Sequence, residues 1–547
     1  MAKTQQILWV ALAIACAEPK TGTNKTSIDG ENFSLEINAV SPQDQDDLFS
    51  QIDGLQLVVN QGDGTQSTHA LVGNVDIQEG SNNAVPPLDN ATLSLVGRTS
   101  EGQVVFHGTS LPLTLSEGSH SISIFIAQNN AMATLSELPS PLAMAPLVAT
   151  GQAQFYFFGG AESGAREPES RRQILRLDLA EPNEEIAAYD IGVSLPSRSD
   201  GGGYMGHTAT MIGGSGEQAG KVVIAGGAPF LLSGMGVITG QDEVSNAAFL
   251  FDPATETIEE IDGLSHARRE HLAVTDPNGD VLVIGGFSSS TSPYLSVAEF
   301  VEKYDADEDR WDTASEAMTA GGLYAAAARY TNQGVLVCGG IDRYFSYTTA
   351  CQLITSNGIL EDAPSLAEPL ISANMTTLAD GRILLTGGLA PGAEPFSTIS
   401  GAEIEATDSA WIYEGGNWRA LDPMKNARAM HSASLLPGGR VLIAGGVSGI
   451  DSTAERVGTG YSGIMYDHAL ALACAETFDP DTERFTALDP CGEGSATATL
   501  PERTLRPAVA TDETVGTIIA GGIGVDRGQS VDSVRIFHPS YGSGDAQ

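Results

Sequence analysis

Basic residues are scarce in this sequence of 547 residues. Lysine and arginine together number 27 against 69 aspartate and glutamate residues, which leaves a formal net charge of −42. The lysines are Lys3, Lys20, Lys25, Lys221, Lys303 and Lys425. A surface with this charge repels the phosphate backbone of nucleic acids. The composition therefore argues against a nucleic-acid partner.

Aromatic side chains and long apolar runs are also limited. Aromatic residues make up 6% of the chain, whereas glycine occurs 63 times without the three-residue period of collagen. This balance favours a turn-rich β architecture. No segment after the N-terminus has the roughly 18 uninterrupted apolar residues that indicate a membrane-spanning helix. Because 41% of the residues are apolar, the chain can bury large cores, and we expect two or more domains.

The N-terminus predicts export. The apolar run at residues 7–15 has the length of a signal-peptide core and is too short to span a bilayer. Its ending, Ala13-Ile14-Ala15-Cys16, resembles the lipobox of bacterial lipoproteins, although leucine is usual at the position of Ala13. The resemblance implies that Cys16 becomes the lipidated first residue of an outer-membrane or cell-surface lipoprotein. An ordinary signal peptide cleaved nearby is the alternative, with a periplasmic or secreted product.

Few cysteines remain once Cys16 is set aside. Cys338 ends one apolar run and Cys351 opens the next, so this pair can face each other across a hairpin. Cys474 and Cys491 bracket a strand–turn–strand pattern. Exported chains sit in an oxidising compartment, so the sequence predicts two local disulfides. Free thiols or metal ligands are the alternatives, but no Cys-x-x-Cys pair supports a metal site.

A seven-fold internal repeat dominates the chain after residue 150. Short, mostly β-branched apolar runs each end in a Gly-Gly pair, which is typical of buried strands whose ends approach other backbone closely. The runs are residues 155–160, 222–227, 281–286, 335–340, 383–388, 441–446 and 517–522. Repeats of this length are a signature of solenoids and propellers.

The same segments surround each Gly-Gly run. A small-residue strand and a short turn lead into the run, a loop of variable length follows, and two more strands joined by a turn complete the unit. Four antiparallel strands with short hairpins and one long loop are typical of a propeller blade. The Gly-Gly runs, the turns at 251–253 and 304–306, and the tryptophans Trp311 and Trp418 resemble kelch repeats over roughly residues 130–540. The resemblance implies a seven-bladed kelch-type β-propeller.

The last unit ends after its third strand, at residues 533–537. Residues 131–138 stand just before the first unit and have the pattern of a fourth strand. We expect this segment to close the ring by pairing with residues 533–537, because an unpaired outer edge is an association hazard. A six-bladed ring is the alternative if this pairing does not form.

The first 130 residues have a different pattern. Short strands, many with alternating polar and apolar residues, are separated by turn signals, which fits a small Ig-like or transthyretin-like β-sandwich. The predicted strands are residues 33–40, 55–60, 69–77, 91–97, 103–108, 111–115 and 120–127. This domain has two interpretations, an adhesive module or a stalk that only lifts the propeller from the membrane.

The sequence therefore predicts an all-β protein with five segments. They are a signal peptide at 1–15, a lipidated cysteine and tether at 16–32, a β-sandwich at 33–128, a propeller at 129–540 and a C-terminal tail at 541–547.

The sequence contains only weak candidates for catalytic or metal-binding residues. His207, His271 and His431 recur at equivalent places in three units, so we interpret them as hydrogen-bonding groups of the fold, with a three-histidine metal site as the alternative. Asp305, Asp307 and Asp309 alternate as in a calcium loop but lack its glycine and glutamate. Copper–tyrosyl oxidases occur among kelch propellers, but their site needs a cysteine cross-linked to tyrosine, and the cysteines here are better explained as disulfides. No catalytic residue, metal or cofactor is predicted.

The loops between second and third strands are the more informative feature. They are long and share one face in a propeller, where aromatic side chains can form a recognition surface. The predicted ligand-binding residues are Phe230, Tyr294, Tyr344, Phe345, Tyr347, Tyr461 and Tyr466. A role in capping the apolar edges of the blades is the alternative.

These patterns lead to a functional hypothesis. We expect a monomeric, lipid-anchored envelope protein whose propeller binds a protein or glycan through the long loops and has no chemistry of its own. The alternatives are a carbohydrate-active or oxidative enzyme with its site at the propeller mouth, and a structural envelope component.

Overall fold

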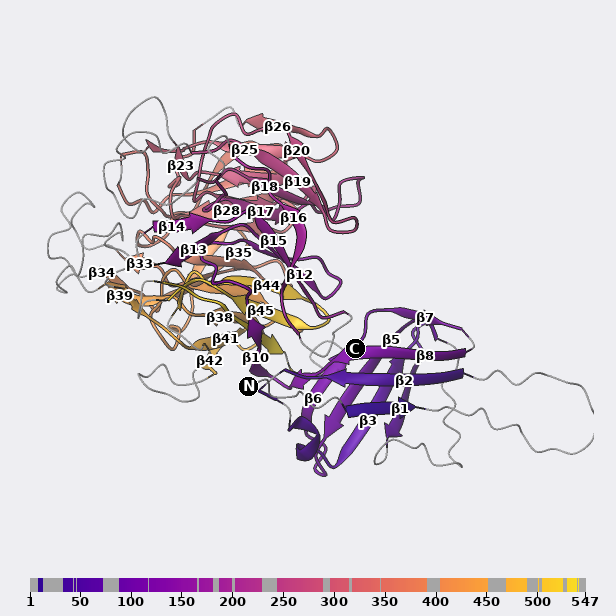
Figure 1. Cartoon of the computed structure of the whole chain (residues 1–547). Coiled ribbons are helices and arrows are strands. Elements are labelled where there is room, and N and C mark those ends of the chain that lie inside the picture. Colours follow the sequence, from indigo (N-terminus) through magenta and orange to yellow (C-terminus); the bar gives the residue numbers. More distant parts are fainter. Residues whose placement is uncertain are drawn as a thin grey trace, which may run out of the picture.

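The fold is all-β over the described residues of the computed structural model. These are residues 8–12, 33–71 except 43 and 46, 88–116, 118–164, 167–180, 186–198, 202–228, 244–288, 296–313, 317–344, 346–390, 404–450, 469–488, 500, 504–524, 529–538 and 540. Their one helical element is a 3-10 turn at Leu48–Gln51. No helix in this part of the chain has the length and apolar character needed to cross a membrane. Figure 1 shows a smaller N-terminal body beside a larger, propeller-like one.

The N-terminal body has two sheets around one core. In the first, β2 (Phe33–Val40) lies between β1 (Leu8–Leu12), its antiparallel neighbour, and β8 (Gly118–Phe125), its parallel neighbour. The second has the order β4-β3-β5-β6-β9, with β7 also pairing β5. Its strands are β3 (Gly54–Asn60), β4 (Gln66–Leu71), β5 (Leu88–Arg98), β6 (Val104–Thr109), β7 (Leu113–Leu115) and β9 (Ala127–Gln128). Ile37, Leu57, Leu95 and Phe106 from both sheets are fully buried against one another.

The predicted strands of this body lie close to the observed ones, with one shift. We expected a strand at 69–77, whereas β4 begins at Gln66, and residues 72–87 lie outside the described part. The Asp63 carboxylate accepts hydrogen bonds from the Thr65 amide at 2.8 Å and from its hydroxyl at 2.7 Å. This tight turn starts the returning strand earlier than the alternation pattern indicated.

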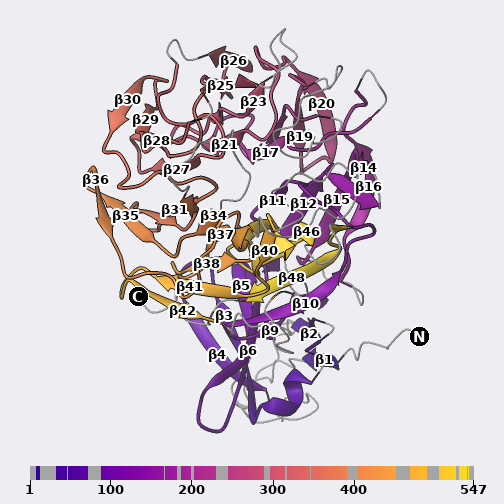
Figure 2. The same ribbon diagram turned by 90° about the vertical axis from the view of Figure 1, so that its left-hand side faces the viewer.

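Among the described residues of the larger body, seven four-stranded antiparallel sheets contribute the inner strands of a ring. Figure 2 shows these sheets arranged around a centre. From the innermost strand outward, they are β11 (Leu147–Ala149), β12 (Gln154–Phe158), β15 (Gln173–Asp178) and β16 (Tyr189–Ser194); β17 (Thr208–Met211), β18 (Val222–Ala225), β19 (Ala248–Asp252) and β20 (Thr257–Ile261); β21 (Leu272–Thr275), β22 (Val281–Ile284), β25 (Val301–Asp305) and β26 (Arg310–Thr313); β27 (Ala326–Tyr330), β28 (Gly334–Cys338), β29 (Cys351–Thr355) and β30 (Leu360–Ala363); β31 (Asn374–Thr377), β32 (Ile383–Thr386), β35 (Ala410–Glu414) and β36 (Asn417–Ala420); β37 (Ser432–Leu435), β38 (Val441–Ala444), β41 (Ala475–Asp479) and β42 (Arg484–Ala487); and β44 (Ala508–Asp512), β45 (Gly516–Ala520), β48 (Ser533–His538) and β10 (Ala131–Glu137). The inner strands contact one another in the closed order β11-β17-β21-β27-β31-β37-β44-β11.

The Gly-Gly pairs join each sheet to the next. Both glycines of every pair have positive φ, from 53° at Gly159 to 114° at Gly388. The amide of the second glycine donates a hydrogen bond to a main-chain carbonyl of the next sheet, in seven equivalent bonds of 2.6–3.1 Å. The donor and acceptor residues are Gly160 and Tyr204, Gly227 and Arg268, Gly286 and Gly322, Gly340 and Leu370, Gly388 and Arg428, Gly446 and Thr504, and Gly522 and Leu142. The bond from Gly522 to Leu142 closes the circuit.

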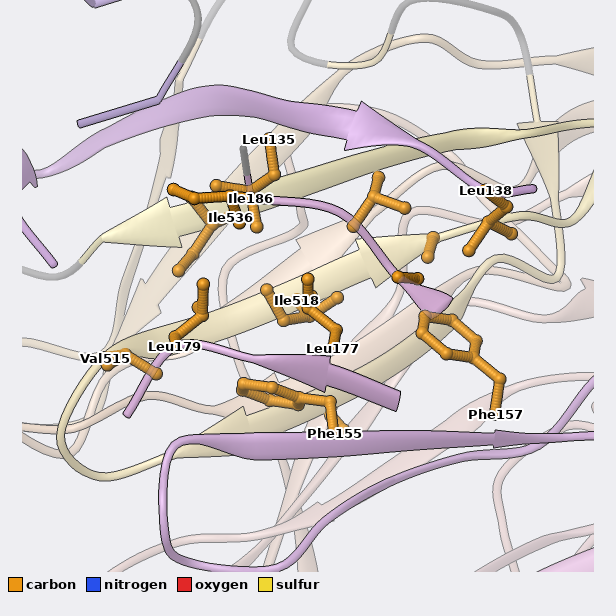
Figure 3. Close-up of a cluster of buried hydrophobic side chains, with 14 of the residues drawn as sticks. Leu135, Leu138, Phe155, Phe157, Leu177, Leu179, Ile186, Val515, Ile518 and Ile536 are labelled. Carbon is orange, nitrogen blue, oxygen red and sulfur yellow. The ribbon is translucent and has the colours of Figure 1, made fainter. Parts of the chain in front are cut away.

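The predicted closing pair is confirmed. β10 pairs antiparallel with β48, so that Ala131 lies opposite His538 and Glu137 opposite Ser533. The first strand of the body thereby completes the last sheet. Figure 3 shows the core beside this junction, where Leu135 and Ile536 lie near Ile518, Phe155 and Leu177.

The two bodies share part of this core. Phe125 and Ala127 of the N-terminal body belong to the same buried cluster as Leu135. The rings of His107 on β6 and His538 on β48 lie 4.0 Å apart between centroids. The N-terminal sheets are therefore packed against the ring through buried side chains.

Two buried ion pairs occupy equivalent places in two sheets. Arg268 pairs with Glu302, and Arg428 with Glu476, and all four side chains have 0% exposure. Each arginine also donates to the carbonyl of the first glycine of its own sheet, Gly285 or Gly445. Sheets without the arginine also lack the glutamate at these places. Three of these five sheets carry Leu370 with Trp411, Gly322 with Gln352, and Tyr204 with Phe249, the last pair with ring centroids 5.6 Å apart.

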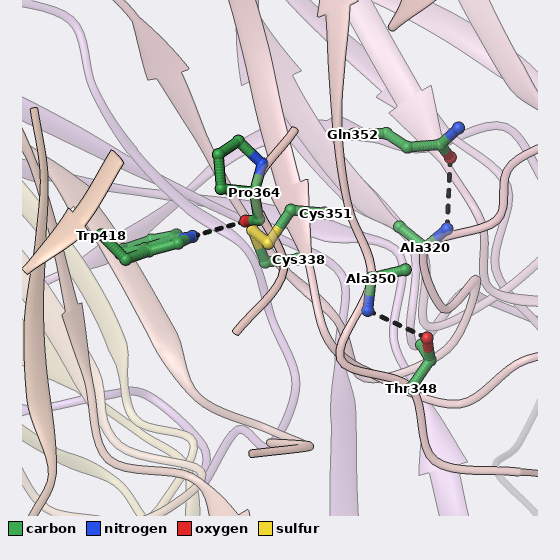
Figure 4. Close-up of a disulfide and its surroundings, with 8 residues drawn as sticks. All are labelled: Ala320, Cys338, Thr348, Ala350, Cys351, Gln352, Pro364 and Trp418. Atoms are coloured by element: carbon green, nitrogen blue, oxygen red, sulfur yellow. Dashed lines mark hydrogen bonds between the residues drawn. A yellow bond between two sulfur atoms is a disulfide. The ribbon is translucent and has the colours of Figure 1, made fainter. Parts of the chain in front are cut away.

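One predicted disulfide is confirmed and a second is partly described. Cys338 and Cys351 lie opposite each other on β28 and β29 and are bonded, with a Cα–Cα distance of 4.1 Å (Figure 4). Cys474 is also in a disulfide. Its predicted partner, Cys491, lies outside the described residues.

Additional short strands that the sequence did not indicate lie in the loops between second and third strands, apart from β43 (Thr504–Leu505), which lies in the crossover segment before β44. They are β13 (Ala161–Gly164) with β14 (Glu167–Ser170); β23 (Phe287–Ser288) with β24 (Ser296–Val297); β33 (Leu389–Ala390), β34 (Ile404–Ala406), β39 (Val447–Ile450) and β40 (Ala469–Ala471) in one sheet; and β43 (Thr504–Leu505), β46 (Ile523–Gly524) and β47 (Gln529–Ser530) in another. Pairing between loops satisfies backbone groups that would otherwise be buried without partners. This layer covers one face of the ring.

Candidate functional site

The structure describes only some of the aromatic residues that we predicted to bind a ligand. Tyr344 and Tyr347 lie within the described residues. Phe230, Tyr294, Phe345, Tyr461 and Tyr466 lie outside them, as does Cys16. The two tyrosines that can be placed have different surroundings.

Tyr344 is exposed on a loop that is held by hydrogen bonds and an ion pair. Its side chain is 72% accessible to solvent. The Asp342 carboxylate accepts hydrogen bonds from the amides of Tyr344 and Ser346, both at 2.9 Å. The Arg343 guanidinium lies 4.8 Å from the centre of the Tyr344 ring and forms an ion pair with Glu299 at 3.0 Å. The loop therefore presents an aromatic ring to solvent in a defined position.

Unlike Tyr344, the Tyr347 side chain packs against other side chains. It bridges to Ile341 and packs against a buried group that we call the cap cluster. The cluster consists of Phe287, Val297, Leu323, Ile341, Ile371, Leu389, Ala429, Met430, Val447 and Ala471. Burial raises the pKa of Tyr347 to about 12. For Tyr347 the capping interpretation fits better than ligand binding.

A ring of equivalent residues lies next to the cap cluster and surrounds a cavity. We call it the mouth ring, and each member comes from the segment just before one inner strand. Its members are Met144, Gly206, Glu270, Tyr324, Ser372, Met430 and Arg506, with φ values from 45° at Arg506 to 64° at Gly206. Main-chain hydrogen bonds join neighbouring members, among them Glu270 to Gly206 at 2.7 Å and Met430 to Ser372 at 3.0 Å. Ser372 is joined to Tyr324 and Arg506 to Met430 in the same way, so these bonds position the backbone from which the side chains project.

Three polar side chains of the mouth ring converge. The Arg506 guanidinium lies 3.2 Å from the Glu270 carboxylate. The Tyr324 hydroxyl donates to the same carboxylate oxygen, Oε2, at 3.3 Å. Arg506 also lies over the Tyr324 ring, 5.3 Å from its centre. Arg269 approaches the other Glu270 oxygen at 3.6 Å, so guanidinium groups flank this carboxylate on both sides.

A cavity of about 430 Å³ lies among these residues. The whole mouth ring lines it, and so do small neighbours such as Ala325 and Ala373. The Ser372 hydroxyl is buried there and has no hydrogen-bond partner among the described residues. This size is within the usual range of small-molecule sites.

The repeated histidines line the same cavity but serve the fold. Nε2 of each hydrogen-bonds to the preceding sheet: His207 to the Phe158 carbonyl at 3.1 Å, His271 to the Thr208 hydroxyl at 2.8 Å and His431 to the Thr386 hydroxyl at 2.9 Å. Burial lowers the pKa of His207 to about 4 and of His431 to about 3, and holds that of His271 well below its usual value. No group of three metal-ligating side chains with suitable geometry occurs among the described residues.

The acidic alternation at Asp305, Asp307 and Asp309 forms a turn. Asp305 accepts the amides of Asp307 and Glu308, and Asp309 accepts the Tyr304 hydroxyl. Some of these residues line a larger hollow of about 1030 Å³ on the opposite face, beside the Lys303–Asp280 ion pair. Because the Asp305 and Asp309 carboxylates are engaged in turn hydrogen bonds, the mouth ring is the stronger candidate site.

The sequence patterns did not indicate the mouth ring. A signal was available, since Gly206, Glu270 and Met430 directly precede the three repeated histidines. Aligning the units at those histidines identifies the equivalent positions in the other sheets. It does not show that the side chains of distant repeats meet.

Comparisons with known proteins concern the overall arrangement alone. No protein-family model and no curated protein sequence matches the chain. The structure of YjhT is similar, with a TM-score of 0.44 and 14% identity, over 65% of this chain and 99% of that one. A fungal alcohol oxidase of the AA5 family, solved in complex with copper, has a TM-score of 0.47 and 14% identity over 75% of each chain.

Proposed function

We propose that this protein is a lipid-anchored envelope protein that binds a glycan through the long-loop face of a seven-bladed kelch-type propeller. The N-terminal body acts as an Ig-like or transthyretin-like spacer between anchor and propeller. The anchor is Cys16, within its lipobox-like sequence. The protein acts as a monomeric binding scaffold and carries out no reaction.

The observation that carries this proposal is the exposed Tyr344. Leaving a large aromatic ring exposed to water costs free energy. Here a hydrogen-bonded turn and a stacked arginine hold the exposed ring in place. An amphipathic ring held rigidly on a loop is typical of recognition surfaces. The C–H face of a sugar ring stacks on such a side chain, while its hydroxyls reach charged neighbours such as Arg343 and Glu299.

A glycan fits this face better than a protein partner. The described residues with large exposed hydrophobic side chains are Tyr189, Tyr344 and Ile359, which do not form a broad apolar patch. Protein interfaces usually bury about 800 Å² on each side around a cluster of such residues. A single exposed aromatic ring with charged neighbours suits a ligand the size of a few sugar units.

The anchor proposal has a consequence for the N-terminal sheet. β1 lies within the segment that is removed when the signal peptide is cleaved before Cys16. Its partner β2 then becomes the edge of its sheet, next to the tether. Mass spectrometry of the protein from its native membrane tests this step by measuring the first residue and its acylation.

Glycan-array screening of the purified protein, followed by calorimetry on the bound glycans, tests the main proposal. We expect Tyr344→Ala to weaken binding by at least about tenfold. The matched control is Tyr189→Ala, which removes another exposed tyrosine from an outer strand, β16. Binding to protein ligands alone, or unchanged glycan affinity in Tyr344→Ala, overturns the proposal.

A further inference from the structure

We propose that the mouth-ring cavity binds one neutral, polyhydroxylated sugar ring. This inference rests on the proposed function and deepens it, because it assigns the terminal residue of the glycan to a second contact on the same face. The cavity of about 430 Å³ is closed around its circumference by residues from all seven sheets. Such a hole admits a single ring-sized ligand and excludes a folded protein surface.

The charges of the lining favour a neutral ligand. Glu270 and Arg506 are the acidic and basic side chains among the lining residues, and they pair with each other at 3.2 Å. The three lining histidines are uncharged near neutral pH because burial lowers their pKa values. The protein as a whole has a formal charge of −42, so an anionic ligand also meets long-range repulsion.

The polar groups of the lining suit hydroxyl groups. A carboxylate only accepts hydrogen bonds and a guanidinium only donates them, whereas a sugar hydroxyl does both. Glu270 and Arg506 thus offer adjacent acceptor and donor groups, and 23% of the Arg506 side chain remains accessible. Pairs of neighbouring hydroxyls on a sugar ring match this arrangement.

The buried Ser372 hydroxyl is an independent observation that points to a ligand. It lines the cavity and lacks a hydrogen-bond partner among the described residues. A buried hydroxyl without a partner is unfavourable, because it has given up its hydrogen bonds to water. A bound hydroxyl group satisfies it, and Ser372 then contributes directly to affinity.

The backbone conformation also indicates that the mouth-ring side chains have a role. Glycine adopts positive φ most readily, yet only Gly206 among the seven positions is glycine. Non-glycine residues in this conformation carry strain, which is common at ligand sites. Tyr324, Met144 and Met430 supply apolar surface for the C–H face of a sugar, while Ala325 and Ala373 leave room for it.

Calorimetric titration of the full-length protein with methyl glycosides of glucose, galactose, mannose and N-acetylglucosamine tests the inference. We expect saturable binding of at least one of them and none of the sugar acids gluconate and glucuronate. Ser372→Ala should raise the Kd about three- to tenfold, and Ser215→Ala, on an exposed turn of the opposite face, should leave it unchanged.

A second variant protects the test against loss of folding. Ala373→Leu fills the cavity, and we expect it to abolish monosaccharide binding while leaving the circular dichroism spectrum unchanged. If Ala373→Leu misfolds, the Ser372→Ala titration decides. Binding of the acids instead of the neutral sugars, or unchanged affinity in Ser372→Ala, overturns the inference.

The two proposals fail in different ways. If glycan binding depends on Tyr344 but no monosaccharide binds, or binding is insensitive to Ser372, then the cavity inference is wrong and the proposed function stands. If no glycan binds at all, both are wrong.

Discussion

Arg428 and Glu476 form an ion pair of 2.8 Å in which neither side chain is accessible to solvent. The arginine also donates to the Gly445 carbonyl at 2.8 Å, and the other glutamate oxygen accepts the Lys425 amide at 2.8 Å. The pair therefore links the crossover segment, the second strand and the third strand of one sheet. Its contribution to folding depends on both partners being present, since a buried charge without its partner is strongly unfavourable.

Replacing one partner should destabilise the protein much more than replacing both. We expect Arg428→Met to lower the unfolding free energy by about 3–5 kcal/mol in urea titrations, because it leaves the Glu476 carboxylate buried and unpaired. The double variant Arg428→Leu with Glu476→Trp copies Leu370 and Trp411 and should recover much of this loss. Arg310→Met, at a pair more than half exposed, is the control and should cost less than about 1 kcal/mol. A single variant as stable as this control contradicts the prediction.

A second prediction concerns the space around the Gly-Gly pairs. A Cβ atom at Gly387 would lie 2.0 Å from the Arg428 carbonyl oxygen, so we expect Gly387→Ala to disrupt the junction between sheets and reduce soluble yield. Gly415 has almost the same φ, 55° against 57°, but open space around it. Gly415→Ala should therefore cost only the backbone strain, about 1–2 kcal/mol. Equal melting temperatures for the two variants would show that strain, and not contact between sheets, explains the glycines.

The buried histidines predict a pH dependence of stability. Their pKa values are lower in the folded protein than in the unfolded chain, about 4 for His207 and about 3 for His431 against an ordinary 6.5. The unfolded state therefore takes up protons first as the pH falls below 6.5. Stability should be greatest above this pH and should fall towards pH 4, with each histidine contributing up to about 1.4 kcal/mol per pH unit.

Because carboxylates also titrate at acidic pH, the comparison between variants decides this prediction. His431→Gln keeps a side-chain group for the Thr386 hydroxyl but cannot be charged. Its unfolding free energy, measured from pH 7.5 to 5, should fall less steeply than that of the wild type. Parallel slopes would mean that His431 does not contribute.

The disulfides predict a specific peptide map and a loss of stability on their removal. Cys338 and Cys351 are 13 residues apart, and a loop of this length corresponds to about 3 kcal/mol in the chain-entropy account. We expect the double variant Cys338→Ser, Cys351→Ser to lose about this amount. Non-reducing digestion should yield a peptide linking these residues and a second linked peptide that contains Cys474. Detection of free Cys338 or Cys351 thiol in the native protein would contradict the assignment.

Much of the ring followed from the repeat. The Gly-Gly runs identified the second strand of each sheet, and the missing last strand predicted the pairing of β10 with β48. Such predictions succeed because strand pairing inside a unit is local and recurs with the same residues. The short strands in the long loops were missed, because those loops differ between units and carry no periodic pattern.

The candidate site, like the ring, could be predicted only in part. The sequence placed Tyr344 and Tyr347 on one loop but could not separate the exposed ring from the packed one, because burial depends on neighbours such as Leu323 and Ile371 from other sheets. It also gave no reason to connect Glu270 with Arg506, which are 236 residues apart.

The sequence by itself determined the repeating β unit, the closing strand and the local disulfide, because each rests on contacts between neighbouring segments or on a pattern repeated seven times. Only the tertiary structure decided which side chains meet at the centre. Closing the ring brings one residue from every unit to the channel mouth, and the convergence of Glu270, Tyr324, Ser372 and Arg506 is a property of that closure.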